Sequence, residues 1–193
     1  LSRPNLEKLI SSTDLDLQIS GSSDLESLVQ QLALSPALRL GSFTRTAAYE
    51  ARLPFLRHVA VGLNYADTYF RNGTYPIPLP NGIGVEAAGV VEQVGEGVSH
   101  VQVGDHVTYT GFLNTLGAYS TERIISAAPL IKLPSGISCE TAAAMTMRGL
   151  TSAYLMTRIW DYKPGDTILL HAAAGGVGLI VSQWAKLLGL TVI

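Results

Sequence analysis

The sequence has a single cysteine, Cys139, among its 193 residues. One cysteine excludes an internal disulfide framework and any zinc lobe built from several cysteines. Charge of either sign is also scarce: 13 lysines and arginines and 15 aspartates and glutamates give a net charge of −2. Because the basic residues are scattered, we expect no nucleic-acid groove held by phosphate contacts.

Long apolar runs are missing as well, and we expect no secretory leader. No run reaches the roughly 18 residues that a membrane-spanning helix needs, and no basic amphipathic helix indicates binding to a membrane surface. The opening LSRPNLEKLI lacks the charged and apolar regions of a signal peptide. The apolar fraction of 47% is typical of a packed globular chain. We therefore expect a cytoplasmic protein with no membrane partner.

Three zones of different residue pattern follow one another along the chain. Residues 1–56 are rich in leucine and serine and carry no chemical motif. From residue 57, short β-like runs alternate with turn residues, which predicts a β-barrel-like domain. After Pro134 the pattern becomes helical: we expect Ser138 to cap a helix and Gly149 to interrupt it.

The last zone reads as a βαβ unit. Residues 167–170 predict a short apolar strand buried on both faces, and Gly189 is a plausible end for the helix that follows. Between them, Ala173, Gly175 and Gly178 occupy the positions of the dinucleotide-binding spacing G-x-G-x-x-G. Free N–H groups at the start of such a helix attract phosphates. The alternative is tight strand–helix packing with no ligand.

Several stretches together resemble one family. They are GLNYADTYFRNGTYPIPLPNGIGVEAAGVVEQVGEGV, GDHVTY, LGAYST and HAAAGGVGLIVSQWAKLLG. The chain is similar, from about residue 57 to residue 193, to the zinc-free quinone oxidoreductases, the zeta-crystallin-like branch of the medium-chain dehydrogenase/reductase superfamily. This resemblance implies an α/β fold with a β-barrel: a partial GroES-like catalytic domain at 57–150, then an incomplete Rossmann domain at 151–193. Residues 1–56 stay unassigned.

The resemblance also implies NADPH as the cofactor, held between the two domains, and a small-molecule quinone as the hydride acceptor. The residue that would distinguish NAD from NADP falls beyond Ile193. Zinc-dependent relatives carry a cysteine at the position of Asn64 and a histidine at that of Val85, and neither residue here is a reasonable zinc ligand. We therefore expect no metal. Full-length family members form homo-oligomers.

Particular residues inherit roles from the same resemblance. The catalytic candidates are Asn64, Tyr69 and Tyr75. The cofactor-binding candidates are Tyr65, Ala66, Asp67, Thr68, Tyr69, Arg148, Thr151, Tyr154, Gly175, Gly176, Val177, Gly178, Leu179 and Ile180. Structural alternatives stay open for three of them: Tyr65 and Tyr69 could pack in a core, and Asp67 could only cap a turn.

Two departures from the family pattern leave alternatives for the function. Residues 1–56 do not match the family's opening strands, which predicts that the strand near residues 58–63 lacks its usual neighbours. A complete Rossmann domain needs two βαβαβ halves, so we expect an incomplete version of the enzyme. An NADPH-dependent quinone reductase, a related zinc-free enone or enoyl reductase, and a non-catalytic nucleotide-binding remnant are the three hypotheses.

Overall fold

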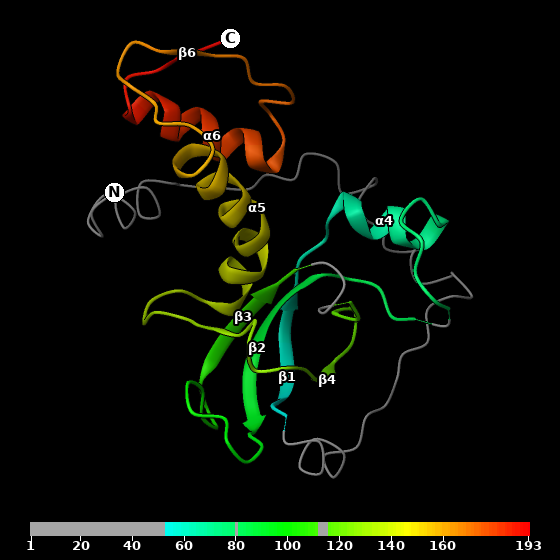
Figure 1. The fold of residues 1–193 in the computed structure, drawn as a ribbon. Coiled ribbons are helices and arrows are strands. Elements are labelled where there is room, and N and C mark those ends of the chain that lie inside the picture. Colours follow the sequence, from blue (N-terminus) through cyan, green and yellow to red (C-terminus); the bar gives the residue numbers. More distant parts are fainter. Residues whose placement is uncertain (1–52, 80, 112–115) are drawn as a thin grey trace. The chain divides into compact units, whose positions relative to one another are not determined.

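A computed structural model describes residues 53–79, 81–111 and 116–193 (Figure 1). The chain forms two compact units that divide between Leu150 and Thr151, and each is described by itself. The predicted features of residues 1–52 lie outside the described residues. Within the described part, no helix is long and apolar enough to cross a membrane.

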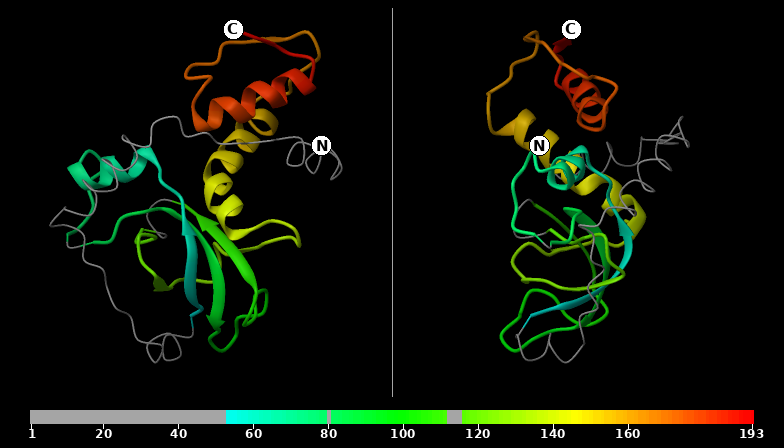
Figure 2. Two further views of the ribbon diagram at one scale, coloured as in Figure 1. Left: turned by 180° about the vertical axis from the view of Figure 1, so that it is seen from behind. Right: turned by 90° about the vertical axis from the view of Figure 1, so that its right-hand side faces the viewer.

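The first unit contains a five-stranded sheet. Its strands are β1 (Phe55–Val61), β2 (Glu86–Gln93), β3 (His106–Thr110), β4 (Glu122–Ile124) and β5 (Ile131–Lys132). The order is β4-β1-β2-β3-β5, every pair is antiparallel, and β1, β2 and β3 lie side by side in both views of Figure 2. Over the described residues this sheet does not close into the expected β-barrel.

Strand β1 pairs with its two neighbours over different lengths. It pairs with β2 over Phe55–Val61 but with β4 only over Phe55–Arg57, and beyond that the His58 N–H donates to the Thr121 oxygen. The residues before residue 53 lie outside the described part of the chain, so the expectation that residues 58–63 lack their usual neighbours stays a prediction.

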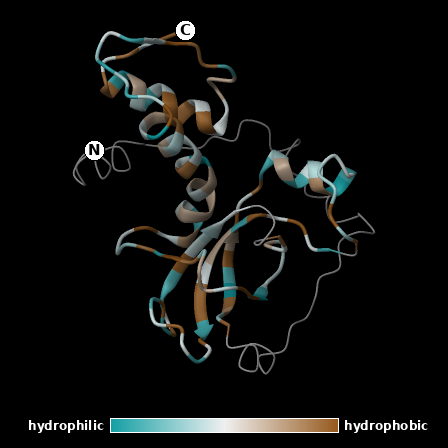
Figure 3. Ribbon diagram, in the orientation of Figure 1, coloured by the Kyte–Doolittle hydropathy of each residue, from teal (hydrophilic) through white to brown (hydrophobic). Residues whose placement is uncertain are grey.

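Strand β2 is buried on both faces because its central residues are small. On one face, Ala87 joins a core with Leu56, Val91, Tyr109 and other apolar residues. On the other face, Ala88 packs against the first turns of helix α5 (Cys139–Thr157). Along β1, whose sequence is FLRHVAV, the hydropathy colouring in Figure 3 shows a polar middle between apolar ends.

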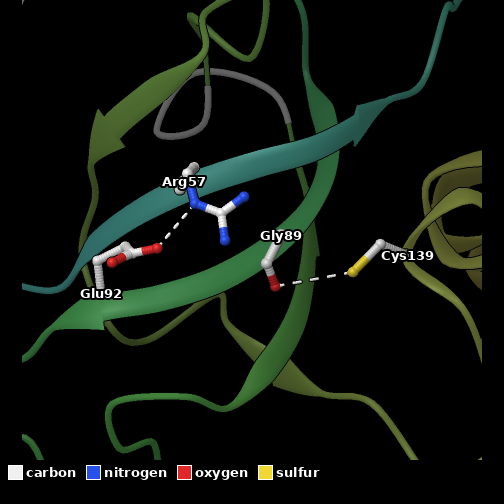
Figure 4. Close-up of polar contacts among 4 residues, drawn as sticks. All are labelled: Arg57, Gly89, Glu92 and Cys139. Carbon is white, nitrogen blue, oxygen red and sulfur yellow. Dashed lines mark hydrogen bonds and ion pairs between the residues drawn. The ribbon is translucent and has the colours of Figure 1, made fainter.

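Gly89 allows β1 and β2 to approach closely. The pairing register shifts between His58 and Ala60, opposite Gly89, and a Cβ at residue 89 would lie 2.1 Å from the Arg57 carbonyl oxygen. Figure 4 shows the neighbouring contacts: Arg57 Nε lies 2.8 Å from Glu92 Oε1, and Cys139 Sγ lies 3.9 Å from the Gly89 oxygen. The partly exposed ion pair contributes little stability; the close approach of the two backbones requires glycine.

Helix α5 begins as expected and continues further than expected. The Thr141 N–H lies 3.2 Å from Ser138 Oγ, which confirms the predicted cap. Gly149 does not interrupt the helix, so that prediction was wrong. A glycine inside a helix costs only about 1 kcal/mol relative to alanine, which the alanine- and methionine-rich turns around it can offset.

The second unit has a two-stranded parallel sheet, β6 (Thr167–Ile168) and β7 (Thr191–Val192), joined by helix α6 (Gly176–Leu187). The βαβ order agrees with the prediction, and Gly189 follows the helix with φ +76°. The expected burial of residues 167–170 was wrong. Within the described residues β6 pairs only with β7, and Leu169 is 71% exposed.

A histidine in the first unit has a defined tautomer. His58 Nδ1 lies 2.7 Å from the Ser120 carbonyl oxygen, which can only accept, so Nδ1 carries the proton. Nε2 then accepts from the Tyr109 hydroxyl at 3.1 Å, and Arg123 donates to that same hydroxyl at 3.3 Å. Burial, followed by the charge of Arg123, lowers the pKa of His58 despite the opposing hydrogen bond to Ser120.

Acid is therefore expected to destabilise the first unit through His58. The unfolded chain, in which histidine titrates near 6.5, takes up the proton before the folded chain does. Stability is thus full above about pH 6.5 and falls as the pH drops toward the lower folded-state pKa. Chemical denaturation between pH 8 and 5 measures this slope. His58→Gln should flatten it; equal slopes for wild type and His58→Gln would contradict the prediction.

Candidate functional site

The candidate site in the first unit begins at helix α4 (Tyr65–Asn72), which our reading of the sequence did not predict. Asn64 precedes the helix in extended conformation, and its N–H donates to Asp67 Oδ2 at 2.9 Å. Gly73, with φ +81°, ends the helix. An asparagine followed three residues later by an acid, with a glycine after the last turn, is a helix signal that could have found it.

Two buried carboxyl groups hold the start of this helix. Asp67 and Glu86 are fully buried. Glu86 accepts from the Asn64 side-chain amide at 2.9 Å and from the Met147 N–H at 2.6 Å. Asp67 accepts from the Tyr119 hydroxyl at 2.7 Å as well as from the Asn64 N–H. Asn64 is thus held at its main chain by one carboxyl group and at its side chain by the other.

Burial dominates the electrostatics of both carboxyl groups. It raises the pKa of Asp67, against the opposing hydrogen bonds from Tyr119 and Asn64. It likewise raises the pKa of Glu86, against the donors Asn64 and Met147 and the charge of Arg148. Burial and the nearby carboxylates also raise the pKa of Tyr119, which therefore stays a donor at neutral pH.

The tyrosines of α4 face solvent and do not pack in a core. Tyr65 is 81% exposed, and Tyr69 and Tyr75 are partly exposed. The Tyr69 and Tyr75 rings meet edge to face with centroids 5.3 Å apart, and the buried Phe70 lies 5.4 Å from Tyr75 on centroids. This cluster is an aromatic surface with two hydroxyl groups, a chemistry that suits a flat aromatic ligand.

The remaining candidates lie on helix α5 and at the start of α6. Arg148, Thr151 and Tyr154 follow one another at intervals of three along α5, and Thr151 and Tyr154 are exposed. Residues 175–180 form the glycine turn and first turns of α6, with Gly175 as its N-cap. The predicted site residues therefore form separate groups, each held by its own element.

The glycine turn has the features of an anion site. No side chain caps the N-terminus of α6, and no acidic residue lies in its first turn. A Cβ at Gly178 would lie 2.3 Å from the Ala172 oxygen and 2.6 Å from Ala173 Cα, so the helix is seated directly on the turn. The Gly175 N–H closes the turn on the Ala172 carbonyl at 2.8 Å. An exposed, uncapped N-terminus over such a turn fits a dinucleotide phosphate.

Neither a metal-ligand cluster nor the cavity beside β6 coincides with the predicted site residues in the described part of the chain. No group of three histidine, cysteine, aspartate or glutamate side chains that could hold a metal occurs within residues 53–79, 81–111 and 116–193. A surface cavity of about 490 Å³ lies beside β6 and is lined in part by Trp160, Tyr162 and Leu169. It contains none of the predicted site residues.

Comparison with known proteins decides the family. A model of the alcohol dehydrogenase GroES-like domain matches residues 55–135. The quinone oxidoreductase of Pseudomonas aeruginosa is 50% identical over 139 residues, covering 72% of this chain and 42% of that protein. This chain belongs to the medium-chain dehydrogenase/reductase superfamily. Its relatives in that superfamily include the quinone oxidoreductases.

Other superfamily members broaden the comparison. The 2-haloacrylate reductase of a Burkholderia species is 46% identical over 145 residues, covering 72% of this chain and 43% of that protein. The crystal structure of Escherichia coli quinone oxidoreductase in complex with NADPH matches with a TM-score of 0.69 at 48% identity, over 73% of this chain and 43% of that one. The chain thus spans less than half the length of these medium-chain relatives.

Proposed function

We propose that this chain carries the phosphate-binding turn and the α4 tyrosines of an NADPH-dependent reductase that acts on quinones. The observation that carries the proposal is the uncapped N-terminus of α6 above its glycine turn. Its N–H groups and partial positive charge suit a pyrophosphate. The relative of known structure with NADPH bound supports the choice of cofactor.

Different residues of the chain would bind different parts of NADPH. Residues 175–178 would hold the pyrophosphate through main-chain N–H groups, and Arg148, Thr151 and Tyr154 would contact other parts of the cofactor. When bound, NADPH supplies the hydride. The segment from Asn64 to Tyr69 would orient the nicotinamide end, since its first residue is fixed by two buried carboxyl groups. The protein thus acts mainly by orientation.

Substrate chemistry follows from the residues beside Asn64. An amide at position 64 and a valine at 85 offer no zinc ligands, so the substrate's oxygen must be activated without a metal. A quinone meets that condition because it already accepts a hydride readily. The exposed rings of Tyr69 and Tyr75 would stack on it, and their hydroxyl groups or solvent would supply the proton.

A second candidate is reduction of an activated carbon–carbon double bond. The 46% identity to a 2-haloacrylate reductase favours it. Both reactions use the same cofactor, so the acceptor must be tested directly.

Saturating NADPH is expected to stabilise the chain by about 2.7 kcal/mol at 100 times its Kd, as mass action requires for a ligand of the folded state. Thermal unfolding with NADPH, and with NADH in parallel, measures this. Loss of NADPH absorbance with a small quinone, compared with a haloacrylate, then separates the two acceptors. Absence of any shift at millimolar cofactor would contradict cofactor binding and with it the proposed function.

A further inference from the structure

One stretch of the family resemblance, LGAYST at residues 116–121, received no role from the sequence. In the structure it is fastened to two other parts of the first unit. Its main chain donates three hydrogen bonds to the segment before β2: from Gly117 and Ala118 to the Gly84 oxygen, both at 3.0 Å, and from Tyr119 to the Ile83 oxygen at 3.1 Å. On the other side, the His58 N–H donates to the Thr121 oxygen at 2.8 Å.

The ring of Tyr119 packs against the main chain at Gly84, where any larger residue would collide with it. A Cβ at Gly84 would lie 2.5 Å from Tyr119 Cδ1, and Gly84 itself has φ +94°, a conformation that favours glycine. The ring direction is therefore fixed by the main chain beneath it. From this seat the Tyr119 hydroxyl reaches Asp67 Oδ2 at 2.7 Å, across 52 residues of sequence.

Asp67 connects the fixed hydroxyl of Tyr119 to the main chain of Asn64. The oxygen that accepts from Tyr119 is also the one that accepts from the Asn64 N–H at 2.9 Å. The other oxygen, Oδ1, is buried and has no hydrogen-bond partner among the described residues. Tyr119 and Asn64 are thus the two donors that the structure gives to this buried carboxylate, and loss of either leaves it with one.

We propose that Tyr119 is a positioning residue for the site: its hydroxyl holds Asp67 as the acceptor that fixes Asn64 and the first turn of α4. This inference rests on the proposed function for its catalytic consequence, because Asn64 and the tyrosines of α4 are the predicted substrate-end residues. Its structural part, the dependence of Asn64 on Tyr119, stands on the contacts alone.

Tyr119→Phe tests the proposal. Without the hydroxyl, Asp67 keeps its proton to higher pH, because a hydrogen bond that lowers its pKa is gone. A protonated Asp67 is a weaker acceptor for the Asn64 N–H. We expect the pH dependence of the ¹H–¹⁵N signal of the Asn64 main-chain amide to move to higher pH than in the wild type. We also expect kcat with quinone to fall about tenfold, the effect of one hydrogen bond to a charged group, with its acid limb moved to higher pH and KM for NADPH little changed.

Tyr109→Phe is the matched control. It also removes the hydroxyl of a buried tyrosine in the same unit, but one that contacts His58 and Arg123 and not Asp67. Its Asn64 signals and pH profile should remain those of the wild type. Asn64 signals and a pH profile unchanged in Tyr119→Phe would overturn the proposal. If the wild type oxidises no NADPH, the proposed function fails, and the Asn64 signals still decide the role of Tyr119.

A second variant covers the case in which Tyr119→Phe does not fold. In Asp67→Asn the carboxylate that accepts from the Asn64 N–H is gone while Tyr119 stays, so the Asn64 main-chain signal should be shifted from that of the wild type, and any remaining pH dependence should be strongest at the side-chain amide, which Glu86 holds. Asn64 signals identical to the wild type in Asp67→Asn would also overturn the proposal.

Discussion

Gly178→Ala is expected to abolish NADPH binding and to lower the stability of the second unit by about 2–4 kcal/mol. The new Cβ would lie 2.3 Å from the Ala172 oxygen and 2.6 Å from Ala173 Cα, both main-chain atoms that no rotamer change can move. Alanine gains at most about 1 kcal/mol over glycine in helix propensity, so the collision decides the sign. To relieve this collision, α6 must shift away from the glycine turn. The N–H groups at the start of α6 would then no longer lie where the proposed pyrophosphate binds.

Thermal unfolding with and without NADPH measures both parts of this prediction. Gly149→Ala is the matched control, since it makes the same chemical change inside helix α5, where a Cβ would meet no heavy atom within 4 Å. It should raise stability by about 0.5–1 kcal/mol and leave the shift caused by NADPH intact. A Gly178→Ala protein that is stabilised by NADPH as strongly as the wild type would show that the turn is not the phosphate seat.

The βαβ unit could be read from the sequence because its signals are local. The spacing of Gly175 and Gly178, the apolar helix after them and the terminal Gly189 all lie in one continuous stretch of the chain, and each has a steric cause. Strand β6 shows the limit of that logic. Its apolar residues predicted burial, but burial depends on what packs against a strand, and the described residues give β6 a single partner.

Helix α4 was missed for a different reason. The stretch YADTYF contains β-branched and aromatic residues, which read as neither a clear helix nor a strand. The helix start is fixed by Asp67, the acid three residues after Asn64. This capping signal is present in the sequence, but the glycines and prolines around the stretch are turn signals and indicate a loop there.

The environment of Asn64 could not be predicted from local pattern. The hydrogen bonds that define it join residues far apart in sequence: 22 residues separate Asn64 from Glu86, 52 separate Asp67 from Tyr119, and 61 separate Glu86 from Met147. Each contact depends on how the strands and α5 pack in space. The donors to Glu86 become visible only in the fold.

Gly62→Ala is expected to cost about 3 kcal/mol or more of stability in the first unit, because the new Cβ collides with the carboxylate that accepts from Asn64's side chain and with the main chain of α5. The added Cβ would lie 2.2 Å from Glu86 Oε2 and 2.5 Å from the Ala143 carbonyl oxygen of α5. The carboxylate could turn away only by releasing the Asn64 amide and the Met147 N–H. The Asn64 amide left without this acceptor costs about 1–3 kcal/mol, and the main-chain collision with Ala143 would remain.

Denaturant unfolding of Gly62→Ala beside Gly97→Ala separates this collision from ordinary backbone strain. Gly97 has φ +87° and open space around its would-be Cβ, so alanine there should cost only the left-handed penalty of about 1–2 kcal/mol. Adding Glu86→Ala to Gly62→Ala should give a total smaller than the sum of the single changes, because the first clash disappears with the carboxylate. The prediction would be contradicted if the costs of Gly62→Ala and Glu86→Ala were strictly additive. It would also be contradicted if Gly62→Ala cost no more than Gly97→Ala, because either result would mean that a Cβ at position 62 does not collide with Glu86.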